Sequence, residues 1–135
     1  MNLRWVILII TTVMLSCQPS INKHELLIDF KVESRSPGGL NQIKSFEQQG
    51  FADQPRKLST EQIADTLKVN FEIFEGASSK TLGNIEIRED SLILKIGKGV
   101  GIRELTIHEY EYKILNPMKK QYKMRIENHI AIDEL

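Results

Sequence analysis

Alternation of apolar and polar residues with a period of two runs through the chain from Leu67 almost to its end. Lys68–Glu75 shows it first, with Val69, Phe71 and Ile73 on one side. The same alternation returns in Leu82–Arg88, Leu92–Ile96, Ile102–Leu115 and the residues after Tyr122. Short alternating runs separated by turn residues are typical of consecutive strands in an antiparallel sheet. The second half of the chain is therefore predicted to be almost entirely β-structure.

The residues before Leu67 add one further strand and two short helical segments to this prediction. His24–Glu33 alternates and ends at the turn residues Ser36–Gly39. Leu40–Gly50 has apolar residues at three-residue spacing, which favours a short helix with Gly50 at its C-terminal stop. Ser59 and Gln62 match a capping box, so we expect a second helix of about two turns to begin there.

Two hairpins can be given a register from the pattern alone. A four-residue turn at Arg88–Ser91 sets Ile87 opposite Leu92 and Ile85 opposite Leu94, on one face.

A turn at Asn116–Met118 would set Tyr112 opposite Tyr122, and His108 then joins the same apolar face. This second register also predicts two ion pairs on its other face, Glu111 with Lys123 and Glu109 with Arg125. The apolar phase changes near Ile107, which indicates a β-bulge at Ile107–His108.

These elements predict a single α+β domain over residues 24–135. We expect an antiparallel β-meander sheet of about six strands, with one or two short helices packed on it. A small β-barrel or sandwich is the alternative. Fold class alone assigns no function.

The N-terminus carries a separate signal. Arg4 precedes an apolar run, Trp5–Leu15, which is followed by Ser16 and by the single cysteine of the chain, Cys17. About eleven apolar residues would form a helix of roughly 17 Å, which is too short for a bilayer core of ~30 Å. The length suits the apolar region of a secretory signal peptide.

Met14–Cys17 resembles the lipobox of bacterial lipoproteins. The resemblance implies cleavage between Ser16 and Cys17, attachment of lipid to Cys17, and thus a signal peptide over residues 1–16. Residues 17–23 would form the lipidated cysteine and a tether. Acyl chains of the palmitate class would anchor the protein firmly. By the same analogy, Gln18 after the cysteine favours the outer membrane; the periplasmic and surface sides both remain open.

Charge and cysteine content narrow the classes of function. Without Arg4, the chain has 17 basic and 18 acidic side chains, a formal charge of −1. No overall positive field would attract nucleic acid, so we expect no nucleic-acid partner. Once Cys17 carries lipid, no thiol is left for a disulfide, for thiolate catalysis or for a metal.

No motif in the chain predicts a catalytic, metal or cofactor site. His24, His108 and His129 lack the spacing of a zinc site. Gly97–Gly101 precedes a strand and not a helix, so hairpin glycines with positive φ are expected there in place of a phosphate-binding loop. No serine lies in a nucleophile elbow.

The favoured function is a membrane-anchored, non-enzymatic interaction or accessory module of the bacterial cell envelope, with an envelope protein as partner. Its contact surface is expected at Lys98, Val100, Lys119 and Lys120. A small-ligand or lipid-binding lipoprotein is the alternative, with a hollow between helix and sheet lined by Phe30, Phe71, Phe74, Tyr110, Tyr112 and Tyr122. An envelope enzyme is the lesser alternative, and it predicts that at least two of His108, Glu109, Glu127 and His129 converge in one pocket.

Overall fold

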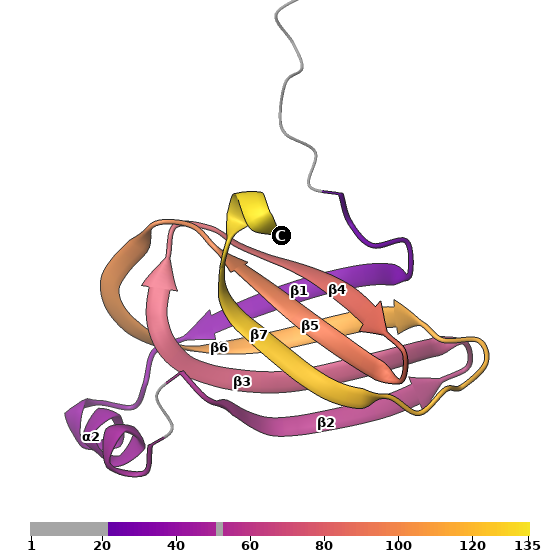
Figure 1. The fold of residues 1–135 in the computed structure, drawn as a ribbon. Helices are drawn as coiled ribbons and strands as arrows, with labels where there is room; N and C mark the ends of the chain where they lie inside the picture. Colours follow the sequence, from indigo (N-terminus) through magenta and orange to yellow (C-terminus); the bar gives the residue numbers. More distant parts are fainter. Residues whose placement is uncertain (1–21, 51–52) are drawn as a thin grey trace, which may run out of the picture.

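Two β-sheets make up most of the computed structural model, which describes residues 22–50 and 53–135 (Figure 1). The larger sheet has four antiparallel strands in the order β1-β6-β3-β2, and the smaller has three in the order β4-β5-β7. The strands of the larger sheet are β1 (Leu27–Arg35), β2 (Pro55–Ile63), β3 (Thr66–Ser78) and β6 (Gly101–Leu115). The smaller sheet contains β4 (Thr81–Arg88), β5 (Ser91–Lys98) and β7 (Lys123–Ala131). The helices are α2 (Leu40–Gln48) and the 3₁₀ turn η1 (Ile132–Glu134).

The prediction of a mainly antiparallel α+β domain is confirmed, with α2 as the single α-helix of the described residues. The strands, however, divide between two open sheets and do not form one continuous meander. This division brings the fold close to the sandwich alternative.

The main core lies between the two sheets. Inward residues of the larger sheet, such as Val69 and Tyr112, and of the smaller sheet, such as Leu92 and Leu94, belong to one buried cluster. These four side chains are fully buried. Burial of apolar surface is the main favourable term in folding, so this interlayer cluster is the principal source of stability.

A second, smaller core lies on the opposite face of the larger sheet, under α2. Phe46 of the helix packs on Phe74, with 5.0 Å between the ring centroids, and Ile107 completes the cluster. The helix therefore explains the change of apolar phase at Ile107. The predicted β-bulge at Ile107–His108 is wrong, because the pairing with β3 continues through both residues without a shift.

The segment around Ser59 is a strand and not a helix, so the capping-box prediction is wrong. β2 pairs with β3 from Ser59 opposite Asn70 to Ile63 opposite Thr66. A helix of two turns is only marginally stable, whereas a strand here satisfies the backbone hydrogen-bonding groups along the edge of β3. The expected helix at Leu40 does form, and Gly50 follows it with φ 69°.

The register Tyr112–Tyr122 is also wrong, because β7 lies in the other sheet. Both edges of β6 are occupied by β1 and β3, and β7 instead runs parallel to β5, from Ser91 opposite Lys123 to Lys98 opposite Ala131. The predicted ion pairs are lost with it. Lys123 pairs with Asp90, Arg125 with Glu127, Glu111 with Lys68 and Lys113, and Glu109 with Arg35.

Asn116 fixes the crossing from β6 to β7. Its side-chain amide donates to Gln62 Oε1 at 3.0 Å and to the carbonyl of Lys120 at 3.1 Å. Its side-chain oxygen accepts the N–H of Lys120, and its backbone N–H donates to the carbonyl of Asp65. This buried asparagine thus joins the β2–β3 turn to the crossing segment.

The β4–β5 hairpin has the predicted register, with Ile87 opposite Leu92 and Ile85 opposite Leu94. The glycines of 97–101 are not held in the left-handed region, contrary to the prediction. Gly97 and Gly99 instead allow close approach, since a Cβ would lie 3.1 Å from Leu135 and 2.7 Å from Ser79 Oγ.

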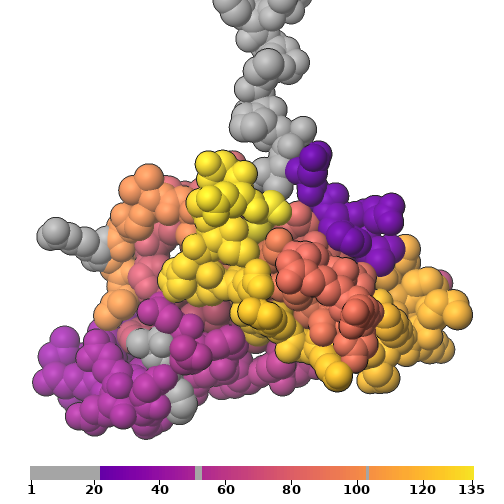
Figure 2. Space-filling model, in the orientation of Figure 1, coloured from indigo at the N-terminus to yellow at the C-terminus, as the bar shows by residue number. Residues whose placement is uncertain are grey.

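Both ends of the described chain meet at Asn84 of β4. Its side-chain amide donates to the carbonyls of Asn22 and Leu135, each at 3.1 Å, and its oxygen accepts the N–H of His24. Figure 2 shows the last residues of the chain on the same side of the molecule as the first described ones. The lipobox and Cys17 lie outside the described residues. Within the described residues, no helix has the length and apolar character needed to cross a membrane.

Candidate functional site

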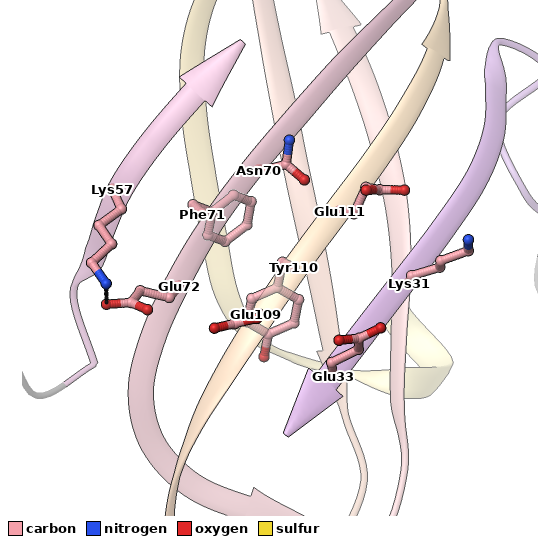
Figure 3. A pocket seen from close by; sticks show the side chains of 9 residues that line it. All are labelled: Lys31, Glu33, Lys57, Asn70, Phe71, Glu72, Glu109, Tyr110 and Glu111. Carbon is pink, nitrogen blue, oxygen red and sulfur yellow. Dashed lines mark ion pairs between the residues drawn. The ribbon is translucent and has the colours of Figure 1, made fainter. Parts of the chain in front are cut away.

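The outer face of the four-stranded sheet carries a hollow of about 330 Å³ (Figure 3). It lies beside the part of this face that α2 covers. All four strands contribute to it, and most of its lining side chains are charged. The lining residues are Lys31, Glu33, Lys57, Asn70, Phe71, Glu72, Glu109, Tyr110 and Glu111.

Strand register sets three glutamates side by side across the hollow. Glu109 of β6 lies opposite Glu33 of β1 on one side and opposite Glu72 of β3 on the other. Like charges directly opposite one another on neighbouring strands are destabilising. A rung of three carboxylates is therefore a costly arrangement that packing within the sheet does not require.

Cations at the edge of the hollow offset part of this repulsion. Arg35 bridges two of the glutamates, with Nη2 at 3.0 Å from Glu72 Oε2 and Nε at 3.0 Å from Glu109 Oε1. Lys57 Nζ lies 3.2 Å from Glu72 Oε1, the contact drawn in Figure 3. Among the described residues Glu33 has no ion-pair partner within 4 Å. The six charged side chains that line the hollow carry a formal charge of −2, and Arg35 and Arg56, which contact Glu72 without lining the hollow, balance this charge.

Glu72 is the most buried of these glutamates. Desolvation disfavours its ionised form, but hydrogen bonds from Lys57 and Arg35 outweigh that effect and lower the pKa of the carboxyl. Lys57 reaches it through an irregularity in β2, where the register shifts between Arg56 and Ser59 and Lys57 itself has φ 53°.

A second polar cluster lies between the two sheets, around Glu75 of β3. The carboxylate is fully buried, and its Oε1 lies 2.6 Å from Lys98 Nζ of β5 and 2.6 Å from His108 Nδ1 of β6. Tyr110 donates its hydroxyl to the same oxygen, while Asn128 of β7 donates to Oε2 at 2.7 Å. Three strands besides β3 therefore supply partners to one carboxylate.

These contacts keep Glu75 ionised in the core. Desolvation opposes ionisation, but hydrogen bonds from His108, Lys98, Tyr110 and Asn128 prevail and lower the pKa of Glu75 to about 2. Burial, and then the charge of Glu75, raise the pKa of Tyr110. The tyrosine thus remains a hydroxyl donor.

Two exposed side chains lie next to Glu75. Asp53 precedes β2, and His129 belongs to β7; their side chains are 55% and 59% exposed. His129 Nε2 is 3.5 Å from Asp53 Oδ1. One ligand atom from each of Asp53, Glu75 and His129 can be chosen so that all lie within 4.8 Å of one another. This is a group of side chains that could hold a metal ion.

The four residues predicted as a contact surface do not lie together. The Lys98 side chain is only 10% exposed and contacts Glu75. Val100 is 77% exposed, in the loop after β5. Lys119 and Lys120 lie near the opposite end of β5, where Lys120 Nζ donates to the carbonyl of Glu89 at 2.7 Å.

The fold brings together two of the four residues that the enzyme alternative named. His108 contacts Glu75 directly, and His129 is grouped with Glu75, so two histidines lie about one carboxylate. Glu109 lies on the outer face of the sheet, in the hollow. Glu127 pairs with Arg125.

The aromatic residues expected to line a hollow between helix and sheet mostly pack on one another. Ring centroids are 5.1 Å apart for Phe71 and Tyr110, and 4.9 Å apart for Phe30 and Tyr112, in the core between the sheets. Phe74 lies on the other face of β3, against α2. Phe71 and Tyr110 also line the hollow on the outer face, but this set does not form the expected hollow between helix and sheet.

Sequence reasoning missed Glu72, Glu75, Asp53, Arg35 and Asn128. One signal was present for Glu75, because it continues the inward series Val69, Phe71 and Ile73 at a spacing of two. A charged residue at a core position of a strand requires partners. The others are assembled from distant segments, and no local pattern marks them.

Comparison of the chain with protein-family models, curated proteins and solved structures finds no match.

Proposed function

We propose that this protein is a lipid-anchored, non-enzymatic module of the bacterial cell envelope that binds a cationic segment of a partner protein in the hollow of its four-stranded sheet. The observation that carries this proposal is the rung of Glu33, Glu109 and Glu72. Its side chains face solvent or the hollow, and their mutual repulsion would fall when a positively charged group is bound.

The position of the tether agrees with this role. Residues 17–22 can span at most about 20 Å, which sets how far an anchored Cys17 can lie from Asn22. Asn22 is bound to Asn84, in the three-stranded sheet. The hollow opens on the outer face of the four-stranded sheet, which points away from the three-stranded sheet. A domain tethered in this way would present the hollow to molecules beyond the membrane surface.

Lipid anchoring is tested separately from partner binding. In cell fractionation, the native chain should remain with membranes, and the Cys17→Ser variant should be released in folded form. Membrane retention of Cys17→Ser would contradict a lipid anchor on this cysteine.

Partner binding is tested by site-specific photo-crosslinking in cells. A photoreactive residue at Asn70, which lines the hollow, should give one major protein adduct, whereas the same residue at Glu47 on α2 should not. Removal of charge by Glu33→Gln with Glu109→Gln should lower the adduct yield several-fold, and the matched pair Asp133→Asn with Glu134→Gln should leave it unchanged.

Two results would speak against the proposed binding surface. Absence of any adduct from Asn70 would reject the hollow as a protein-binding site, and an adduct insensitive to the glutamate variants would reject the electrostatic basis. A bound small molecule recovered with the protein, without a protein adduct, would favour the small-ligand alternative.

A further inference from the structure

Asp53, Glu75 and His129 form the group of side chains in the described residues that most resembles a metal centre. They are 22 and 54 residues apart in sequence and come from the segment before β2, from β3 and from β7. We propose that these three residues bind a divalent transition-metal ion of the Zn²⁺ class. The site goes beyond the proposed partner binding, which uses the other face of the larger sheet.

The ligand types and their spacing fit such an ion. Two carboxylates and one imidazole are ligands that Zn²⁺ accepts, with bonds of about 2.0–2.2 Å. Such bonds place neighbouring ligand atoms of a tetrahedral site roughly 3.3 Å apart. His129 Nε2 and Asp53 Oδ1 are already 3.5 Å apart, and the whole group lies within 4.8 Å. The ion would require only a small contraction of the group.

The backbone brings the two exposed ligands to the buried one. The β5–β7 register shifts between Lys95 and Gly97, so that Asn128 and His129 form a bulge in β7. Bulges commonly re-aim side chains near functional sites. On the other side, the N–H of Asp53 donates to the carbonyl of Phe74 at 2.9 Å, next to Glu75. Asp53 has φ 58° and His129 has φ 63°, so both ligands come from left-handed residues.

Partners of Glu75 would act as the outer shell of the site. Lys98, His108 and Tyr110 all contact Oε1, while Asn128 is the partner of Oε2. Groups of this kind fix the orientation of a metal-binding carboxylate. Within the part of the chain that the structure describes, Oε2 has one hydrogen-bond partner and Oε1 has three, so Oε2 is the oxygen with room for a further ligand. Lys98 neutralises one carboxylate charge, which leaves a net charge of −1 from Asp53, Glu75 and Lys98 for the dication to meet.

Three protein ligands leave a coordination position for water or a further ligand. The high exposure of Asp53 and His129 opens the site to solvent on that side. Mg²⁺ and Ca²⁺ prefer all-oxygen surroundings, so the imidazole favours Zn²⁺ over both.

The test is calorimetric titration of Zn²⁺ into the full-length protein, purified in detergent and stripped of metal with a chelator. We expect one ion per chain and a rise in the unfolding temperature when Zn²⁺ is present. Asp53→Asn and His129→Asn should each weaken binding at least tenfold. Asparagine tolerates positive φ, so both variants keep a residue suited to the native backbone.

Matched variants elsewhere provide the control. Asp90→Asn and His24→Asn should bind Zn²⁺ as tightly as the native chain, and all four metal-free proteins should unfold at similar temperatures. Mg²⁺ in the same titration should bind at least tenfold more weakly than Zn²⁺. The proposal is overturned if Zn²⁺ does not saturate one site, or if either Asp53→Asn or His129→Asn fails to weaken binding tenfold. Either result would leave the crosslinking outcome at the hollow unaffected.

Discussion

Lys98 Nζ lies 2.6 Å from Glu75 Oε1, although the two residues belong to different sheets. Both side chains are almost completely removed from solvent. The pair therefore joins the two layers of the fold by a charge interaction within a largely apolar core. Removing one partner would leave the other as a buried, uncompensated charge.

The first prediction concerns this pair. Glu75→Gln should lower the free energy of unfolding by about 3–5 kcal/mol, because Lys98 then lacks its counter-charge. The double variant Glu75→Gln with Lys98→Met should lose less than the sum of the two single variants, since no lone charge remains. Urea unfolding of the native chain, the two single variants and the double variant measures the coupling energy between Glu75 and Lys98. Additive losses would show that the pair does not act as a unit.

The second prediction is a pH dependence that arises from Glu72. Its pKa in the folded protein is lowered, so its contribution to stability is present above the ordinary value of 4.5 and is lost as the pH falls below it. Between about pH 7 and pH 3.5, the native chain should therefore lose more stability than Glu72→Gln does. Glu47→Gln on α2 is the control and should follow the native chain. If the stability of all three proteins changed equally with pH, the pH dependence could not be attributed to Glu72.

The third prediction tests the contact between β1 and β4. A Cβ at Gly83 would clash with the ring of Phe30, which also packs against Tyr112. Gly83→Ala should therefore destabilise the protein by about 1–3 kcal/mol through overpacking. Gly76→Ala is the matched control, because a Cβ added there would have no atom within 4 Å beyond its chain neighbours. Thermal unfolding compares the two, and an unchanged Gly83→Ala would mean that Phe30 can move aside.

The fourth prediction concerns the crossing between the sheets. Asn116→Ala removes side-chain partners from Gln62 and Lys120 in a buried setting, so a loss of about 1–3 kcal/mol is expected. Asn41→Ala, on the exposed side of α2, should cost less than ~0.5 kcal/mol. Hydrogen exchange should also show faster exchange at the start of β7 in Asn116→Ala. If the amides at the start of β7 were protected as well as in the native chain, contacts other than those of Asn116 would hold the crossing from β6 to β7 in place.

The sequence predicts the strands well because their alternation is local. The β4–β5 hairpin could be registered residue by residue, since a short turn at Glu89 and Asp90 leaves little freedom for the pairing. The pairing partner of β7 could not be predicted in this way. Its alternation shows that one face is buried, but it does not show which sheet provides the neighbour. Both edges of β6 are paired, with β1 and β3, which lie far away in sequence.

Prediction of the candidate sites fails for a related reason. Ser59 and Gln62 form a valid local capping signal, but the free edge of β3 provides a stronger competing partner. Glu33, Glu72 and Glu109 become neighbours only through two strand registers, and Asp53 meets His129 only after β2 and β7 are placed. Sites assembled from distant segments in this way leave no spacing to be recognised.

The pairing of β1 with β6 has a consequence for how the protein reaches its folded state. Leu27 pairs with Ile114, so the first strand cannot enter its sheet until most of the chain is available. Contacts between residues so far apart in sequence slow folding, because a long loop must close first. The larger sheet would therefore remain incomplete until the end of β6 has been synthesised, because β6 lies between β1 and β3.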